Sequence, residues 1–215
     1  MKTPFTAEQF IDTFFQYNQA IFPLQIVFYL IGILTIYLLF KPGSGKIVSF
    51  ILSFFWLWMG IVYHLIFFTT INKAAYFFGS VFILQGVLLF NYGFIKSKLS
   101  FTIRPDVYGI TGIVMILCAL IVYPVLGYSF GHIYPYSPTF GLPCPTTIFT
   151  FGVLLMIDKK YPLIIFVIPF IWSIIGFTAA FNFGIIEDTL LVISGLTTFT
   201  MLLIRNKESN QYTSA

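Results

Sequence analysis

Long apolar runs separated by short loops are the feature that most constrains this chain. Seven stretches consist almost wholly of apolar and small residues: 21–40, 47–70, 74–95, 107–128, 146–157, 162–184 and 185–204. A run of about 20 such residues crosses a bilayer as a helix. Only 8% of the residues are charged, against about 25% in an ordinary soluble domain. The sequence therefore predicts an all-α membrane protein with seven transmembrane helices.

The basic residues predict the orientation of these helices. Nine Lys and Arg residues fall in alternate loops that belong to one side, whereas Lys2 and Lys73 belong to the other. The positive-inside rule places the nine in the cytoplasm. We therefore expect the N-terminus outside and the C-terminus inside. The nine residues are Lys41, Lys46, Lys96, Lys98, Arg104, Lys159, Lys160, Arg205 and Lys207.

Residues 6–17 precede the first apolar run and have the pattern of a short amphipathic helix. Thr6 and Gln9 fit a capping box. Ala7, Phe10, Ile11, Phe14 and Phe15 share one face. We expect this helix to lie flat on the outer leaflet. The predicted organisation is an interfacial helix and lead-in at 1–20, a seven-span domain at 21–204 and a cytoplasmic tail at 205–215.

The segment 131–147, GHIYPYSPTFGLPCPTT, interrupts the apolar pattern with four prolines and two glycines. The fifth apolar run that follows has 12 residues and reaches roughly 18 Å as a helix, whereas the hydrocarbon core is about 30 Å thick. Irregular backbone at membrane depth is tolerated where protein or a wet cavity surrounds it. We therefore predict a re-entrant segment that packs among the helices, with Cys144 as N-cap and Pro145 as the first helical residue.

This geometry predicts a binding site in an outward-facing vestibule. A helix N-terminus presents free N–H groups and partial positive charge, which suits an anion or a thiolate on Cys144. Polar residues at membrane depth are functional candidates by default, because their burial is costly. The candidate ligand-binding residues are His64, Gln85, His132, Tyr134, Tyr136, Cys144, Thr146, Thr147, Glu187 and Asp188. Several also have a structural interpretation: His64 and Gln85 can bond neighbouring helices, and Glu187 and Asp188 can favour the first turn of span seven.

Several other patterns are weaker. GSGK at 43–46 lacks the remaining residues of a phosphate-binding loop. The scattered basic residues make no nucleic-acid patch, so we expect the lipid bilayer as partner and no nucleic acid. Gly176, Ala180 and Gly184 recur every four residues, which permits close helix packing inside the monomer or a homodimer seam.

Three stretches resemble a bacterial family of small multi-pass membrane proteins known only as a domain of unknown function. They are PFTAEQFIDTFFQYNQAIFPLQ at 4–25, WLWMGIVYHLIFFTTINKAA at 56–75 and GHIYPYSPTFGLPCPTTIFTFGVLL at 131–155. The likeness runs over nearly the whole chain. It implies a bacterial inner-membrane location, and it supplies neither a substrate nor a catalytic residue.

Three functions remain open from the sequence. The first is the binding or passage of a small solute, which could be anionic, at the vestibule lined by 131–147. The second is an intramembrane redox or metal-dependent enzyme that uses Cys144 with His64 or His132, since thiolate and imidazole suit copper or zinc. The third is an accessory or assembly subunit without a ligand.

Overall fold

The chain folds as a helical bundle in a computed structural model that describes residues 4–158 and 162–211, except for the side chains at 179, 180 and 206–211. Within these residues the structure has helices and two isolated β-bridges but no β-strand. The α-helices are α1 (Ala7–Ile21), α2 (Leu24–Leu39), α3 (Gly45–Trp58), α4 (Ala75–Leu89), α5 (Val107–Leu117), α6 (Tyr123–Ser129), α7 (Pro143–Leu155), α8 (Ile164–Phe183) and α9 (Thr189–Gln211). The π-helical turns η1 (Met59–Phe67), η3 (Phe90–Ile95) and η4 (Cys118–Val122) extend α3, α4 and α5, and the 3₁₀ turns η2 (Phe68–Thr70) and η5 (Ile186–Asp188) follow η1 and precede α9.

Five continuous helices of the described chain are long and apolar enough to cross a membrane. They are Gly45–Thr70, Ala75–Ile95, Val107–Ser129, Ile164–Phe183 and Ile186–Arg205. The pair α1 and α2, bent by 86°, makes a sixth if it counts as one span. The predicted first and fifth spans are therefore shorter than full crossings: α2 has 16 residues and α7 has 13.

Helix α1 has the predicted capping box, and its buried face differs in part from the predicted one. The Gln9 amide N–H donates to the Thr6 Oγ1 at 3.2 Å, and the Thr6 amide N–H donates to the Gln9 Oε1 at 2.9 Å. Phe10 and Phe14, which were expected to face the outer leaflet, are buried in the protein, and Ala7 is exposed. The reason is that α1 turns its aromatic side toward the protein, where Phe10 packs against Phe183 with ring centroids 5.2 Å apart.

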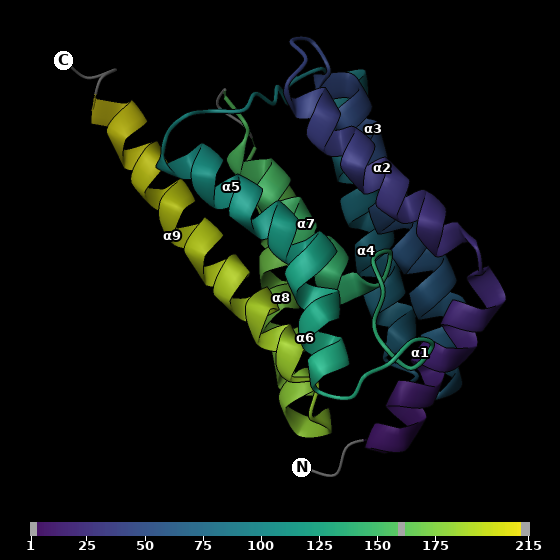
Figure 1. Ribbon diagram of the computed structural model, residues 1–215. Coiled ribbons are helices and arrows are strands. Elements are labelled where there is room, and N and C mark those ends of the chain that lie inside the picture. Colours follow the sequence, from purple (N-terminus) through teal and green to yellow (C-terminus); the bar gives the residue numbers. More distant parts are fainter. Residues whose placement is uncertain (1–3, 159–161, 212–215) are drawn as a thin grey trace.

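Helix α7 lies at the centre of the bundle, between α5 on one side and α8 and α9 on the other (Figure 1). All its residues are buried except Cys144, which is partly exposed. Its approach to α5 is close because Gly112 and Gly152 face each other: a Cβ added at Gly152 would lie 2.6 Å from the Gly112 carbonyl oxygen. A helix so enclosed can be short, because it meets protein rather than lipid on every side.

Two groups of loops cover the two ends of α7. We call one end of the bundle the α1 end, where α1 and residues 131–142 lie, and the other the opposite end, where residues 96–106 lie (Figure 1). At the opposite end, the backbone N–H of Thr102 donates to the Met156 carbonyl at 3.0 Å, and that of Asp158 donates to the Ser100 carbonyl at 3.1 Å. The C-terminal part of α9 also reaches this end, where the Arg205 guanidinium donates to the Ile157 carbonyl.

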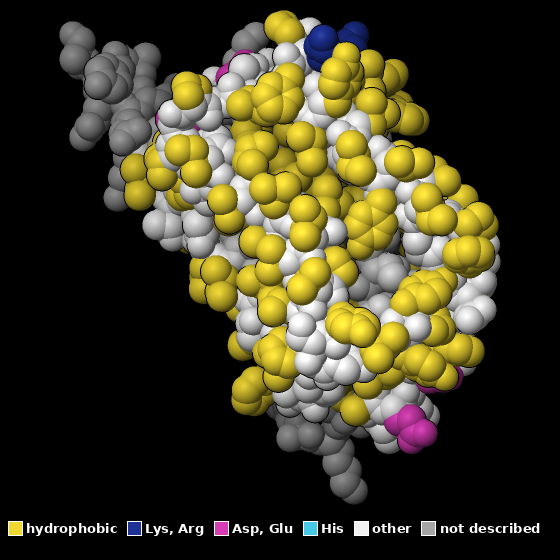
Figure 2. Space-filling view, viewed as in Figure 1, with side chains coloured by type: hydrophobic (Ala, Val, Ile, Leu, Met, Phe, Trp, Pro, Cys, Tyr) yellow, Lys and Arg dark blue, Asp and Glu magenta, His cyan; other side chains and the backbone are white. Residues whose placement is uncertain are grey.

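The surface matches the expectation of a membrane protein. Figure 2 shows hydrophobic side chains along the whole length of one face, with Lys and Arg at its upper end and Asp or Glu at the lower right, where α1 lies, and at the upper left. Many large apolar side chains on α2, α5 and α9 are exposed, including Leu30, Ile110 and Ile193. Soluble monomers rarely expose so continuous an apolar surface.

Candidate functional site

The Pro- and Gly-rich segment 131–142 packs against the bundle at the α1 end. It leaves α6 through Gly131, whose φ of +90° suits glycine, and the His132 N–H then closes on the Gly127 carbonyl at 2.8 Å. Asn18 of α1 holds the middle of the segment: its Nδ2 donates to the Pro135 and Ser137 carbonyls at 2.7 and 2.8 Å. The chain is buried from residue 140 onward. This anchoring fixes where α7 begins.

Helix α7 begins two residues earlier than the sequence suggested, so the prediction of Cys144 as N-cap and Pro145 as the first helical residue was wrong. Leu142 is the N-cap, with extended backbone, and Pro143, Cys144 and Pro145 occupy the first three helical positions. The first helical hydrogen bond runs from the Thr146 N–H to the Leu142 carbonyl at 3.2 Å. Both prolines fit because the amides of the first turn have no intrahelical acceptor in any case.

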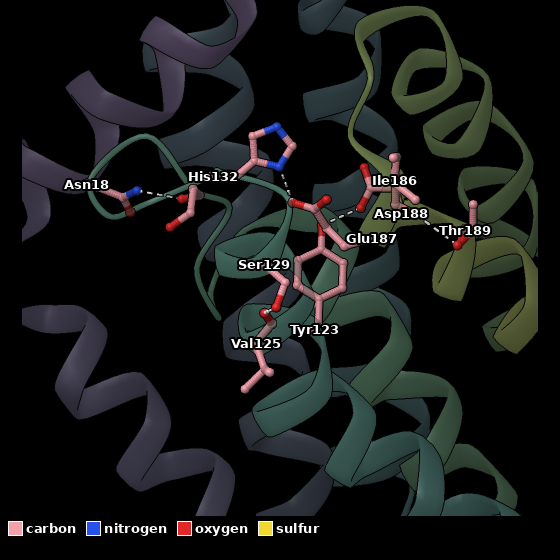
Figure 3. A network of polar contacts seen from close by, with 10 residues as sticks. Asn18, Tyr123, Val125, Ser129, His132, Ile186, Glu187, Asp188 and Thr189 are labelled. Carbon is pink, nitrogen blue, oxygen red and sulfur yellow. Dashed lines mark hydrogen bonds and ion pairs between the residues drawn. The ribbon is translucent and has the colours of Figure 1, made fainter.

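Two neighbouring acidic residues at the start of α9 meet α6 and α7 beside this helix N-terminus. The Tyr123 hydroxyl donates to the Asp188 Oδ1, and the Cys144 thiol is a second hydrogen-bonding partner of the Asp188 carboxyl. The His132 Nδ1 lies 2.8 Å from the Glu187 Oε1. Figure 3 shows His132 directed at Glu187, and the ring of Tyr123 standing near Asp188. Both carboxyl groups are buried.

A cavity of about 230 Å³ opens beside this acidic pair, between α1, η1, α8 and the start of α7. Among the described residues that line it, Asp188 is the only acidic or basic one, and Cys144 lies next to it. Eight of the remaining lining residues are aromatic, and they come from residue 5, α1, the turns η1 and η2, α4 and α8. The aromatic residues are Phe5, Phe10, Phe14, Tyr63, Phe68, Phe78, Trp172 and Phe183.

Trp172 of α8 supplies an unused hydrogen-bond donor in the wall of this cavity. Its side chain is about nine-tenths buried, and its indole N–H has no partner among the described residues. Gly176, one turn further along α8, leaves room beside it: a Cβ added there would lie 3.6 Å from the Trp172 Nε1 and 3.7 Å from the Cys144 Sγ. The indole N–H, the thiol and the Asp188 carboxyl thus gather at one side of the cavity.

The structure brings some of the ten sequence-predicted residues together and not others. Cys144 and Asp188 line the cavity, whereas Glu187 and His132 form the adjacent ion pair. Thr146 lies just behind the helix start, and its Oγ1 accepts the Gly141 N–H at 2.9 Å. These five residues lie close together, and their role in binding a ligand stays a prediction.

The other five residues do not line the cavity. His64 sits in an aromatic box, 5.3 Å from Trp172 and 4.5 Å from Phe82 between ring centroids, and neither of its ring nitrogens has a partner among the described residues. Gln85 links α4 to α8 through the Ile165 carbonyl at 2.7 Å. Thr147 is buried on α7, but away from the cavity. The remaining two, Tyr134 and Tyr136, are exposed on the segment above the cavity.

Sequence reasoning missed most of the cavity wall. Trp172 sits in an apolar run where a tryptophan gives no periodic signal, and the aromatic residues of α1 were assigned to lipid. Tyr123 was also missed, although a tyrosine inside an apolar span needs a partner for its hydroxyl and was therefore detectable.

Of the small residues at 176, 180 and 184 on α8, Gly176 packs against another helix inside the monomer. Gly176 is buried, and a Cβ added there would lie 2.8 Å from Leu191 of α9. Gly184 is exposed with a φ of +78° and ends α8, while the Ala180 side chain lies outside the described residues. In the described parts of the chain, no group of three or more His, Cys, Asp and Glu side chains is placed to hold a metal ion.

One family of known sequences matches the chain over almost its whole length. A family described only as a family of unknown function (DUF6064) matches residues 7–213. Neither a curated protein nor a solved structure matches the chain. The match extends from the start of α1 through α9, and it includes the segment 131–142 and every described residue of the acidic pair and the cavity beyond Phe5. The chain therefore belongs to the family of unknown function DUF6064.

Proposed function

We propose that this membrane protein binds a small organic molecule in the cavity between α1, α8 and the start of α7. The observation that carries the proposal is the unpartnered Trp172 N–H in the wall of a 230 Å³ aromatic cavity. A buried donor without a partner costs about 1–3 kcal/mol. A molecule with an oxygen acceptor would recover that energy while its apolar body covered the aromatic rings.

The dimensions support a molecule rather than an empty packing defect. An apolar cavity of about 150 Å³ is enough to bind benzene, and this one is larger. Functional pockets combine mostly apolar walls with a few convergent polar groups. Here Asp188, Cys144 and Trp172 converge on one side, and the polar side chains of Asn72, Thr178 and Asn182 also line the cavity.

The charge at the start of α7 favours a neutral or cationic occupant over the anion that the helix N-terminus alone suggested. Asp188 and Glu187 are both buried there. Their negative charge already complements the partial positive charge of the helix N-terminus. An anion would meet two carboxyl groups at close range.

We further propose that the α1 end faces outward from a bacterial inner membrane, with seven segments threading the bilayer and a short α7 counted as the fifth. The loops that carry Lys41, Lys96, Lys98 and Arg104 meet at the opposite end, since the Ile103 N–H donates to the Leu39 carbonyl. That grouping supports the charge asymmetry on which the orientation rests.

The orientation is tested with a fluorescent protein that matures only in the cytoplasm. Fused after residue 215, it should be bright. A dark but fully produced fusion would reverse the orientation.

The binding proposal is tested by filling the cavity. The three tryptophans, Trp56, Trp58 and Trp172, are replaced by 5-fluorotryptophan, and a Trp172→Phe variant assigns its ¹⁹F resonance. In neutral maltoside detergent, acetophenone offers an aromatic ring and one carbonyl acceptor. It should shift the Trp172 resonance saturably and leave the Trp56 resonance in place.

The matched variants use two neighbouring residues of α8. Ile175→Trp places a large ring in the cavity that Ile175 lines, whereas Ile174→Trp places it on the outer surface, where Ile174 is 45% exposed. Acetophenone should no longer shift the Trp172 resonance in Ile175→Trp, and it should still do so in Ile174→Trp. An equal response in both variants would place the probe elsewhere and remove the proposal.

A further inference from the structure

We infer that the molecule bound in this cavity is an organic cation, a quaternary or protonated amine that also carries an oxygen acceptor. The inference rests on the proposed function, and it adds the chemical class of the ligand. It follows from three features of the same cavity: an acidic group without a counter-charge, walls made of aromatic rings, and a free indole donor.

The first feature is the charge of the acidic pair. Glu187 has His132 beside it, with the His132 Nδ1 2.8 Å from the Glu187 Oε1. Asp188 has two neutral partners, the Tyr123 hydroxyl and the Cys144 thiol, and no Lys, Arg or His of the described chain forms an ion pair with it. A charge held inside a membrane bundle is costly unless it is paired. A cation in the adjoining cavity supplies that pair.

The second feature is the composition of the walls. Eight lining residues are aromatic, and they come from elements far apart in sequence. The Phe5 and Phe183 rings are 4.9 Å apart between centroids, and Phe10 and Phe183 are 5.2 Å apart, so α1 and α8 close one side with packed rings. Aromatic rings around a site attract cations through their negative faces, and cages of this kind recognise quaternary ammonium groups.

The third feature is the position of Trp172. Its Nε1 lies near Gly176, where a Cβ would be 3.6 Å from the Nε1 and 3.7 Å from the Cys144 Sγ. It is a donor, so it cannot bind an ammonium group, and it calls for an oxygen on the same molecule. The cavity therefore fits a short molecule with an ammonium head for Asp188 and the rings, and a hydroxyl, ester or carbonyl oxygen for the indole.

The test compares two probes of equal shape. Choline and 3,3-dimethylbutan-1-ol differ by a nitrogen in place of a carbon, so only the first is charged. Both are titrated against the 5-fluorotryptophan protein in maltoside detergent, which contains no choline headgroups. We expect choline to shift the Trp172 resonance with a Kd at least tenfold lower than that of its neutral isostere.

Two variants connect the preference to Asp188. Asp188→Asn should raise the Kd for choline at least tenfold and leave that for 3,3-dimethylbutan-1-ol unchanged. Asp12→Asn, on the exposed face of α1, should change neither. The Trp56 and Trp58 resonances report whether each variant is folded, and the two-probe comparison in the unmodified protein stands even if Asp188→Asn does not fold.

The outcomes separate this inference from the proposed function. Equal affinity for the two probes, or binding of acetophenone alone, would overturn the cation and leave the binding cavity in place. Failure of all three probes to shift the Trp172 resonance would overturn both.

Discussion

The two ends of α7 are closed in different ways. At the opposite end, the backbone of residues 96–106 pairs with the backbone at the end of the helix, through the Thr102–Met156 and Asp158–Ser100 hydrogen bonds. At the α1 end, side chains make the closing contacts. Asn18 binds the segment 131–142, and aromatic rings line a cavity of about 230 Å³.

The difference shows how one short helix can serve both stability and binding. Backbone pairing depends little on side-chain identity, so the opposite end can be sealed by almost any sequence that reaches it. Closure by side chains depends on a few residues and leaves shaped space between them. Polar and aromatic groups therefore accumulate at the α1 end, and the contrast can be tested by substitutions at each end.

The largest effect is expected from Asn18→Ala at the α1 end. The change removes two hydrogen bonds to the Pro135 and Ser137 carbonyls, and a third with Thr139 at 2.8 Å. Because Asn18 is fully buried, we expect a loss of about 2–3 kcal/mol in the free energy of unfolding. Thermal unfolding in detergent measures it. Gln16→Ala, on the exposed face of the same helix, is the control, and an equal loss in both would show that the loop does not depend on Asn18.

A smaller effect is expected at the opposite end from Asp106→Ala. Asp106 caps α5, and its Oδ1 accepts the Gly109 N–H at 3.0 Å. Loss of such a cap costs about 1 kcal/mol. Thermal unfolding at pH 7 should show this cost as a lower midpoint in the variant.

The cost of Asp106→Ala should also depend on pH. Burial raises the pKa of the Asp106 carboxyl, but the hydrogen bonds from the Gly109 amide and the Arg104 guanidinium outweigh it and leave the pKa below its usual 3.8. A carboxyl with a lowered pKa stabilises the fold above its unfolded pKa and loses that contribution as pH falls through the folded value. The gap between wild type and variant should hold from pH 7 to 5 and shrink below about pH 4. A gap that is constant down to pH 3 would mean that the charge has no part in the cap.

The smallest effect is expected from Thr102→Ala. Its hydroxyl lies 3.3 Å from the exposed Asp158 carboxylate, while the backbone hydrogen bond to Met156 survives the change. Exposed substitutions of this kind usually alter stability by less than about 0.5 kcal/mol. A loss as large as that of Asn18→Ala would erase the contrast between the two ends.

The sequence predicts the apolar segments and the irregular backbone ahead of α7, because both follow from the residues of each segment alone. The capping box of α1 was predictable for the same reason, since Thr6 and Gln9 are three residues apart. The number of full crossings was not, because hydropathy alone does not show that α2 bends from α1 by 86°, or that α7 is surrounded by protein.

The candidate site was predicted only where polar residues stood out against apolar neighbours. Asp188, Glu187, His132 and Cys144 were found in this way. Trp172 and the aromatic residues of α1 could not be placed, because a cavity arises from how distant helices pack, and an apolar side chain that lines it has the same sequence pattern as one that faces lipid. His64 was predicted to lie at the site, but the π-helical turn η1 places it in an aromatic box beside Trp172 rather than in the cavity wall.

The complete burial of α7 has a consequence for how the protein is assembled in the bilayer. A 13-residue helix that carries Pro143, Pro145 and three threonines is too short and too polar to partition from the translocon as an independent span. Its side chains are shielded from lipid only when α5, α8 and α9 pack around it. We therefore expect α7 to enter the membrane together with the helices that follow it, so that the biogenesis of the C-terminal half is a concerted event rather than a sequence of single insertions.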